Sequence, residues 1–199
     1  MNNDAIRSGI DSAVREIGAA LPDASSLSVD ASRRILSRYS ASITPNFVFW
    51  MAGAMLFARS SDAQLILAEN LRVEVCDDHP ALLRAFVASA GVAVCQDDIV
   101  VNTGAFADMC HRSDGLSLIA VIAVMESASA VFIPFLAERS RKCGGTDFRY
   151  TNVHGVADVL HAEDCIRALE YEMFQYQDTE HRVMVAVEQV VEFLCEIFL

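Results

Sequence analysis

Basic residues are scarce in this sequence, and lysine is almost absent. The 199 residues contain 15 Lys or Arg against 27 Asp or Glu, and Lys142 is the single lysine. The resulting formal net charge of -12 is opposite in sign to the basic surface that nucleic-acid phosphates require. We therefore expect no nucleic-acid partner. Where a carboxylate has to be bound, arginine is the available cation and the better bidentate donor.

Paired cysteines and a signal peptide are also missing. No two of the six cysteines form a C-x2-C pair, which disfavours a zinc finger or a disulfide framework. The first residues, MNNDAIRSGIDSAVREIG, form a polar amphipathic stretch without the apolar core of a signal peptide. These absences favour a cytoplasmic protein with reduced, mostly buried thiols.

Alternating apolar and polar runs, which are typical of strands, do not occur over any long stretch. Apolar residues instead recur at helical spacing, as at Ile6, Ile10 and Ile17. Asp30 is a possible N-cap, and Thr44-Pro45 has the pattern of a cap followed by proline at the first helical position. The sequence predicts one all-α domain over residues 1–199, with helices near 3–21, 30–40, 45–57, 61–76, 80–90, 97–112, 115–141, 147–176 and 179–198.

Residues 116–137 form the longest apolar run, LSLIAVIAVMESASAVFIPFLA, and its length alone would allow a membrane span. Glu126 lies at its centre, where a carboxylate would be costly in hydrocarbon. We therefore predict a core helix with Glu126 facing inward, and no membrane partner. A buried carboxylate needs either an arginine partner or a bound cation, and the sequence leaves both open.

Two of the five histidines lie close together in residues 150–169, YTNVHGVADVLHAEDCIRAL. His154, Asp158 and His161 form an H-x3-D-x2-H pattern. At about 100° per residue, all three side chains project from one narrow stripe of a helix. Such a stripe suits one metal centre, although an amphipathic helix with two chance histidines on its wet side would give the same pattern.

A third polar cluster surrounds the expected helix break near Pro80. Glu69, Glu74 and His79, together with Asp77 and Asp78, could supply a carboxylate and an imidazole to the same centre. Taken alone, they also fit a polar helix end in which Asp78 or His79 caps the next helix. The combined set of three histidines and three carboxylates suits a pair of iron or manganese ions better than one structural zinc.

These three blocks resemble the haem-oxygenase-like diiron oxidase family, which is related in fold to the TENA/PqqC-like helical enzymes. The resemblance covers roughly residues 65–170. It consists of an N-L-x-x-E stretch (Asn70 to Glu74) with a following His-Pro, then Glu126, then the H-x3-D-x2-H helix. The family's first Glu usually lies farther from its His, so Glu69, Asp77 or Asp78 could replace Glu74. The two E-x2-H motifs of ferritin-like diiron proteins are absent from the sequence.

The resemblance implies a haem-oxygenase-like bundle of about seven helices that holds two Fe2+ ions and uses O2 as a co-substrate. The implied function is an O2-dependent non-haem diiron oxidoreductase in natural-product biosynthesis, which desaturates, cyclises or cleaves a small aliphatic amino-acid-type substrate. N-oxygenation or oxidative decarboxylation of an amino or fatty acid is an alternative, as is a metal-free helical binding protein of the same fold. The implied metal ligands are Glu74, His79, Glu126, His154, Asp158 and His161.

The sequence says less about the substrate and the assembly. Arg149, just before the metal helix, and Arg72, beside the first block, are candidates for binding a substrate carboxylate. The apolar last helix is compatible with a core element or with a homodimer interface. Candidates for hydrophobic walls around the metals are Phe47, Phe49, Trp50, Met51 and Phe106.

Overall fold

The computed structural model describes residues 3–23, 25–95 and 101–199, and the side chains of 101–102 and 156–159 lie outside its described part. Within these residues all regular secondary structure is helical, which confirms the all-α prediction. The described helices are α1 (Asn3–Ala20), α2 (Val29–Ile43), α3 (Phe47–Phe57), α4 (Ser61–Cys76), α5 (His79–Ser89), α6 (Val101–Arg112), α7 (Gly115–Lys142), α8 (Arg149–Met173) and α9 (Thr179–Phe198). This count matches the nine segments expected from local patterns rather than the seven or so that the resemblance implied.

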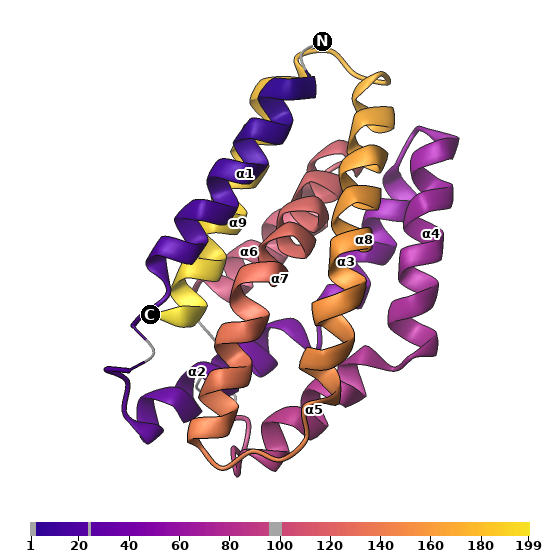
Figure 1. The fold of residues 1–199 in the computed structure, drawn as a ribbon. Coiled ribbons are helices and arrows are strands. Elements are labelled where there is room, and N and C mark those ends of the chain that lie inside the picture. Colours follow the sequence, from indigo (N-terminus) through magenta and orange to yellow (C-terminus); the bar gives the residue numbers. More distant parts are fainter. Residues whose placement is uncertain (1–2, 24, 96–100) are drawn as a thin grey trace.

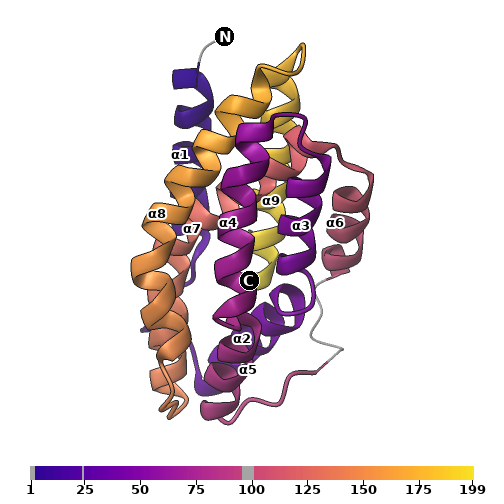
Figure 2. The same cartoon turned by 90° about the vertical axis from the view of Figure 1, so that its right-hand side faces the viewer.

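Helix α7 lies at the centre of the bundle, and its most extensive contact is with α8 (Figure 1). Helices α1 and α9 pack side by side on one flank of α7, whereas α4 packs between α3 and α8 on the other (Figure 2). Helices α2 and α5 lie at the same end of the bundle and contact each other. The central α7–α8 pair therefore passes between α4 and the layer formed by α1 and α9.

Helix α7 is buried along most of its length because its sequence is apolar on nearly every face. The Asp114 side chain caps its start by accepting a hydrogen bond from the Ser117 amide, and Gly115 lets the helix approach the Phe57 carbonyl closely. In the described part of the chain, α7 alone is long and apolar enough to span a membrane, and 78% of its apolar window is buried inside the protein. Glu126 is 4% exposed, as expected for an inward-facing carboxylate.

Two predicted helix starts are wrong by two residues. Ser28, not Asp30, caps α2, and its hydroxyl accepts a hydrogen bond from the Ala31 amide. Asp30 instead lies in the first turn, where its charge still favours the positive helix end. Thr44 ends α2, and Asn46 precedes α3. Residues 97–100 of the predicted helix 97–112 lie outside the described residues.

Candidate metal centre

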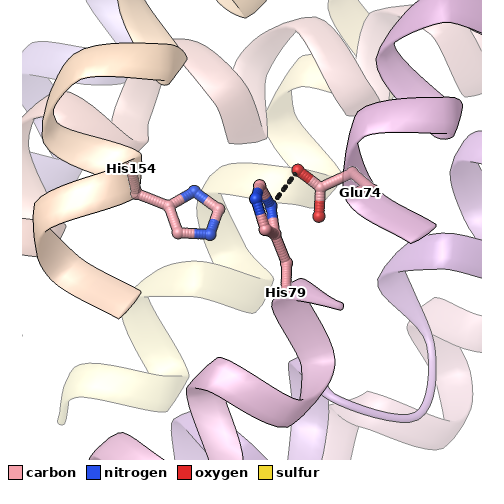
Figure 3. A group of neighbouring side chains, drawn as sticks. All are labelled: Glu74, His79 and His154. Atoms are coloured by element: carbon pink, nitrogen blue, oxygen red, sulfur yellow. Dashed lines mark hydrogen bonds and ion pairs between the residues drawn. The ribbon is translucent and has the colours of Figure 1, made fainter. Parts of the chain in front are cut away.

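A sharp turn between α4 and α5 brings Glu74 and His79 into contact. Helix α4 ends at Cys76, and Asp78 adopts a left-handed conformation with φ of 50°. Aspartate tolerates this region, and here its carboxylate also accepts a hydrogen bond from the Ala81 amide to begin α5. The reversal turns His79 back towards α4, so that His79 Nδ1 lies 2.7 Å from Glu74 Oε1 (Figure 3). Both side chains are buried.

Helix α8 supplies two further imidazoles. The rings of His154 and His79 are neighbours in an edge-on arrangement, with centroids 4.7 Å apart (Figure 3). His161, two turns later on the same stripe, has its Nδ1 4.0 Å from Glu126 Oε2 of α7. The helical-stripe prediction is therefore confirmed for the two histidines, which are both buried. Asp158 lies in α8 between them, but its side chain is outside the described residues.

The buried groups form two clusters that share one carboxylate. Glu74, His79 and His154 form the first cluster, and Glu74, Glu126 and His161 form the second. Within each cluster, one nitrogen or oxygen atom per residue lies within 4.8 Å of the others. Such convergence of imidazole nitrogens and carboxylate oxygens is the arrangement that binds metal ions in proteins. These buried His/Glu clusters could thus hold metal.

The electrostatics of the clusters favour a bound cation. Glu74 is 2% exposed and Glu126 is 4% exposed, and burial of two neighbouring carboxylates is costly unless a positive charge compensates them. Within the clusters, Glu74 Oε1 lies 2.7 Å from His79 Nδ1, and Glu126 Oε2 lies 4.0 Å from His161 Nδ1. His161 Nδ1 is buried and has no hydrogen-bond partner in the described part of the structure. The donor set of the clusters therefore fits a metal ion.

Alternative carboxylates near Glu74 point away from this centre. Glu69 is exposed and forms an ion pair with Arg72, whose Nη2 lies 2.7 Å from Glu69 Oε1. This hydrogen bond lowers the pKa of Glu69. Asp77 and Asp78 are exposed as well. Of the four candidates, the structure places only Glu74 in the clusters.

A cavity of about 550 Å3, counting its opening, lies beside the first cluster. Glu74, His79, Glu126 and His154 form part of its wall. Its apolar walls include Ile43, Phe47, Val48, Leu83, Phe132 and Ile133. A small molecule in this cavity would contact the side chains of the cluster directly, in apolar surroundings.

Most of the residues that the sequence analysis expected around the substrate do not line the cavity. Of the five apolar wall candidates, only Phe47 lines the cavity; Phe49 is exposed, and Trp50, Met51 and Phe106 belong to the core. The exposure of Phe49 could not be predicted, because α3 is apolar on all faces and its sequence pattern does not identify the buried side.

Arg149 and Arg72, the expected carboxylate-binding residues, do not line the cavity. The Arg149 side chain is 68% exposed, and its Nη2 lies 2.6 Å from Asp147 Oδ2. Arg72 forms its ion pair with Glu69 on the outer surface of α4. A role for either arginine in substrate binding stays a prediction, and it would require the arginine to leave its present partner.

Sequence analysis missed two polar pairs beside the clusters. Tyr39 of α2 and Tyr150 of α8 line the cavity, and their hydroxyl oxygens lie 2.7 Å apart. Asn70 of α4 donates a hydrogen bond to the Cys165 sulfur of α8 over 3.3 Å. Burial, and then the negative charge of Glu126, raises the pKa of the Cys165 thiol. A usable signal existed for this pair, because Asn70 and Cys165 each lie four residues along a helix from a predicted ligand.

Comparison with known proteins identifies the fold. No protein-family model matches the sequence, and no curated protein matches it. Among solved structures, the crystal structure of a TenA homolog from Pseudomonas syringae pv. tomato is similar, with a TM-score of 0.71 and 14% sequence identity. The match covers 97% of this chain and 89% of that chain. At this identity the similarity shows the fold alone: the chain has the all-helical, haem-oxygenase-like fold of TenA proteins.

Proposed function

We propose that this protein is an O2-dependent non-haem diiron oxidase, as its resemblance to the haem-oxygenase-like diiron oxidases implies. The observation that carries the proposal is the pair of buried clusters sharing Glu74. One cluster would be expected of a single-metal site. Two clusters that meet at one carboxylate are the arrangement expected of two metal ions bridged by that carboxylate.

Together the two clusters supply three imidazoles and two carboxylates. His79 and His154 would bind one ion and Glu126 and His161 the other, with Glu74 between them. Asp158 would add a third carboxylate from the helix face that carries His154 and His161. Hard carboxylates and borderline imidazoles in equal numbers suit Fe2+, whose higher oxidation states carboxylates stabilise.

The protein around the ions would control their reactivity. When bound, the iron pair would supply the O2 chemistry. The chain fixes its ligands on four helices, keeps the cluster atoms away from bulk water, and places an apolar cavity next to the first cluster. A substrate held in that cavity would present a C–H bond to the oxidant while water is excluded.

Two metal-free alternatives receive less support from the site. A thiaminase-like enzyme would require a cysteine nucleophile in the cavity, yet none of the described lining residues is a cysteine. A helical binding protein would not need two buried carboxylates among three buried imidazoles. Desaturation, cyclisation or cleavage of the substrate stays a prediction, with N-oxygenation and decarboxylation as the alternatives. Cytoplasmic location and a homodimer likewise stay predictions.

The proposal is tested by reaction with oxygen. Apoprotein is loaded anaerobically with two equivalents of Fe2+ and mixed with O2-saturated buffer in a stopped-flow spectrophotometer, with O2 uptake recorded in parallel. We expect a transient visible absorption and O2 consumption in the wild type. Neither should occur in the Glu74→Ala variant, which loses the shared ligand. Loaded protein that consumes no O2 beyond free Fe2+ would refute the proposal.

A further inference from the structure

The chemistry of the cavity wall restricts what can bind beside the clusters. Apart from the four cluster residues, its polar side chains are the hydroxyls of Tyr39, Thr44, Ser129 and Tyr150. Ser129 already donates a hydrogen bond to the Glu126 carbonyl over 2.6 Å. The remaining lining residues are apolar. Outside the cluster residues, the wall therefore offers hydrogen bonds through neutral groups only.

Outside the clusters, a charged substrate group would find no oppositely charged side chain along the described part of this wall. Neither arginine nor lysine occurs among the described lining residues. The ionisable groups that are present, Glu74 and Glu126, would repel an anion in the metal-free protein. Transfer of an unpaired carboxylate into such a site costs far more than a hydroxyl or an amide that keeps one hydrogen bond. In the metal-loaded protein an ammonium group would face the bound cations, and a carboxylate could be compensated only by coordinating those ions themselves.

The tyrosine pair is the rigid polar feature of the wall. Tyr39 is 3% exposed and Tyr150 is 4% exposed, and their hydroxyl oxygens lie 2.7 Å apart. Aromatic contacts hold both rings, since Tyr39 packs against Phe132 and Tyr150 packs against Phe86. The Tyr150 ring also lies 4.4 Å from the His154 ring, centroid to centroid. A ligand atom bound by these hydroxyls would thus be fixed relative to the first cluster.

We propose that the substrate is a compact, uncharged molecule with an apolar body and one neutral hydrogen-bonding group, such as a hydroxyl or a carboxamide, which Tyr39 and Tyr150 bind. The remainder of the molecule lies among Ile43, Leu83 and Ile133, next to His154. This assignment replaces the amino-acid substrate expected from the sequence, because the arginines that would hold a carboxylate are outside the cavity. It deepens the proposed function, since it names the substrate class of that site.

The test is a matched ligand series measured by isothermal titration calorimetry. Hexanamide, 1-hexanol, hexanoate and hexylammonium are titrated into metal-free protein and into Zn2+-loaded protein, which performs no oxygen chemistry. We expect hexanamide and 1-hexanol to bind both forms, with hexanoate at least about tenfold weaker in the metal-free protein and hexylammonium at least about tenfold weaker in the Zn2+-loaded protein, or ~1.4 kcal/mol. Hexanoate that binds the metal-free protein as tightly as hexanamide would overturn the proposal, as would failure of all four probes to bind.

Three variants and one control test which residues give the preference for uncharged ligands. Tyr39→Phe and Tyr150→Phe should weaken hexanamide about tenfold, the value of one buried hydrogen bond, while binding of benzene is unchanged. Tyr171→Phe, at an exposed position of α8, is the matched control and should leave both affinities unchanged. Thr44→Arg places a cation at the half-buried rim and should shift the preference towards hexanoate. Equal loss of benzene and hexanamide in the Phe variants would contradict specific recognition by the hydroxyls.

Failure of this proposal is distinguishable from failure of the proposed function. The calorimetric selectivity is measured without iron and without O2, so it does not depend on oxidase activity. Protein that binds two irons and consumes O2 but prefers hexanoate would retain the oxidase assignment and lose the substrate class. Protein that binds no iron but still selects hexanamide would lose the oxidase assignment and retain the ligand class of the cavity.

Discussion

Buried carboxylates lie in two regions along helix α8, and the groups that surround these carboxylates differ between the two regions. Near its end, Glu172 is 0% exposed, and its two oxygens accept hydrogen bonds of 2.8 and 2.9 Å from the Arg59 amide and of 2.8 Å from the Ser60 amide. These amides precede α4, so the carboxylate also meets the positive end of that helix. Around the first half of α8, Glu74 and Glu126 lie instead among imidazoles and close to each other.

The difference indicates two purposes for a buried carboxylate. Backbone amides are permanent donors, so Glu172 is compensated by the folded chain itself and joins α8 to the start of α4. Glu74 and Glu126 lie instead close to each other and to imidazoles, which are metal ligands, and two neighbouring buried carboxylates are costly unless a positive charge compensates them. The first region is therefore structural, and the second could hold a metal ion.

The largest effect is expected from Glu74, which belongs to both clusters. Glu74→Ala should lower the affinity for both metal ions by more than about 100-fold, since the loss of even an indirect partner costs 10–100-fold. Glu69→Ala, on the exposed face of the same helix, should leave metal binding unchanged. Metal content after equilibrium dialysis compares the two variants directly. A matching loss in Glu69→Ala would contradict the assignment of Glu74.

Removal of His161 should affect one cluster and spare the other. His161→Ala is expected to bind one metal ion per chain instead of two, because Glu74, His79 and His154 remain. Circular dichroism should show unchanged helix content, and O2-dependent turnover should be abolished. His181→Ala, at an exposed position of α9, serves as the histidine control. Full turnover by the His161 variant would remove this residue from the centre.

Loss of the structural carboxylate should appear in stability and not in metal content. Glu172→Ala leaves buried backbone amides without acceptors and should lower the free energy of unfolding by about 1–3 kcal/mol. Glu163→Ala removes only an exposed ion pair of the same helix and should cost less than about 1 kcal/mol. Urea denaturation of the metal-free proteins measures both changes. Reduced metal stoichiometry in the Glu172 variant would contradict the distinction between the two regions.

Substitution of Glu126 should have a smaller effect on the free energy of unfolding of metal-free protein, opposite in sign to that of Glu172→Ala. Glu126→Gln removes one of two neighbouring buried carboxylates and should raise the free energy of unfolding of metal-free protein at pH 8 by about 1 kcal/mol. Glu172→Gln should lower it under the same conditions. Stabilisation by added Zn2+ should then be smaller in the Glu126 variant than in the wild type. Equal destabilisation by the two substitutions would mean that Glu126 is compensated as fully as Glu172.

The smallest effect concerns the dry environment beside Glu126. Burial and nearby negative charge raise the pKa of the Cys165 thiol. The thiol therefore stays protonated when the pH rises past the ordinary pKa of a cysteine. Native protein at pH 9 should therefore leave Cys165 unmodified by iodoacetamide, whereas the exposed Cys76 and Cys95 react. Peptide mass mapping identifies the modified residues. Modification of Cys165 at the rate of Cys76 would show that water reaches this part of the centre.

The sequence predicts the features that depend on local periodicity. Helical spacing places His154 and His161 on one stripe, and the apolar run around Glu126 predicts an inward carboxylate; the structure confirms both placements. The choice between Glu69 and Glu74 could not be made, because the two lie about 140° apart on one helix and only packing decides which faces inward.

Features that join distant parts of the chain were not predictable. The hydroxyls of Tyr39 and Tyr150 meet across 111 positions of sequence, and no local pattern relates them. The exposure of Arg149 and Arg72 follows from ion pairs with near neighbours, Asp147 and Glu69, which compete with any substrate. The cavity wall is thus a property of the assembled bundle rather than of one motif.

The most direct test of the central claim is an anaerobic Fe2+ titration of wild-type apoprotein beside the Glu74→Ala variant, read out as iron retained per chain. Two retained irons in the wild type, with none retained in the variant under the same conditions, is the predicted result. No iron retained by the wild type, or equal iron in both proteins, would contradict a metal centre built around Glu74.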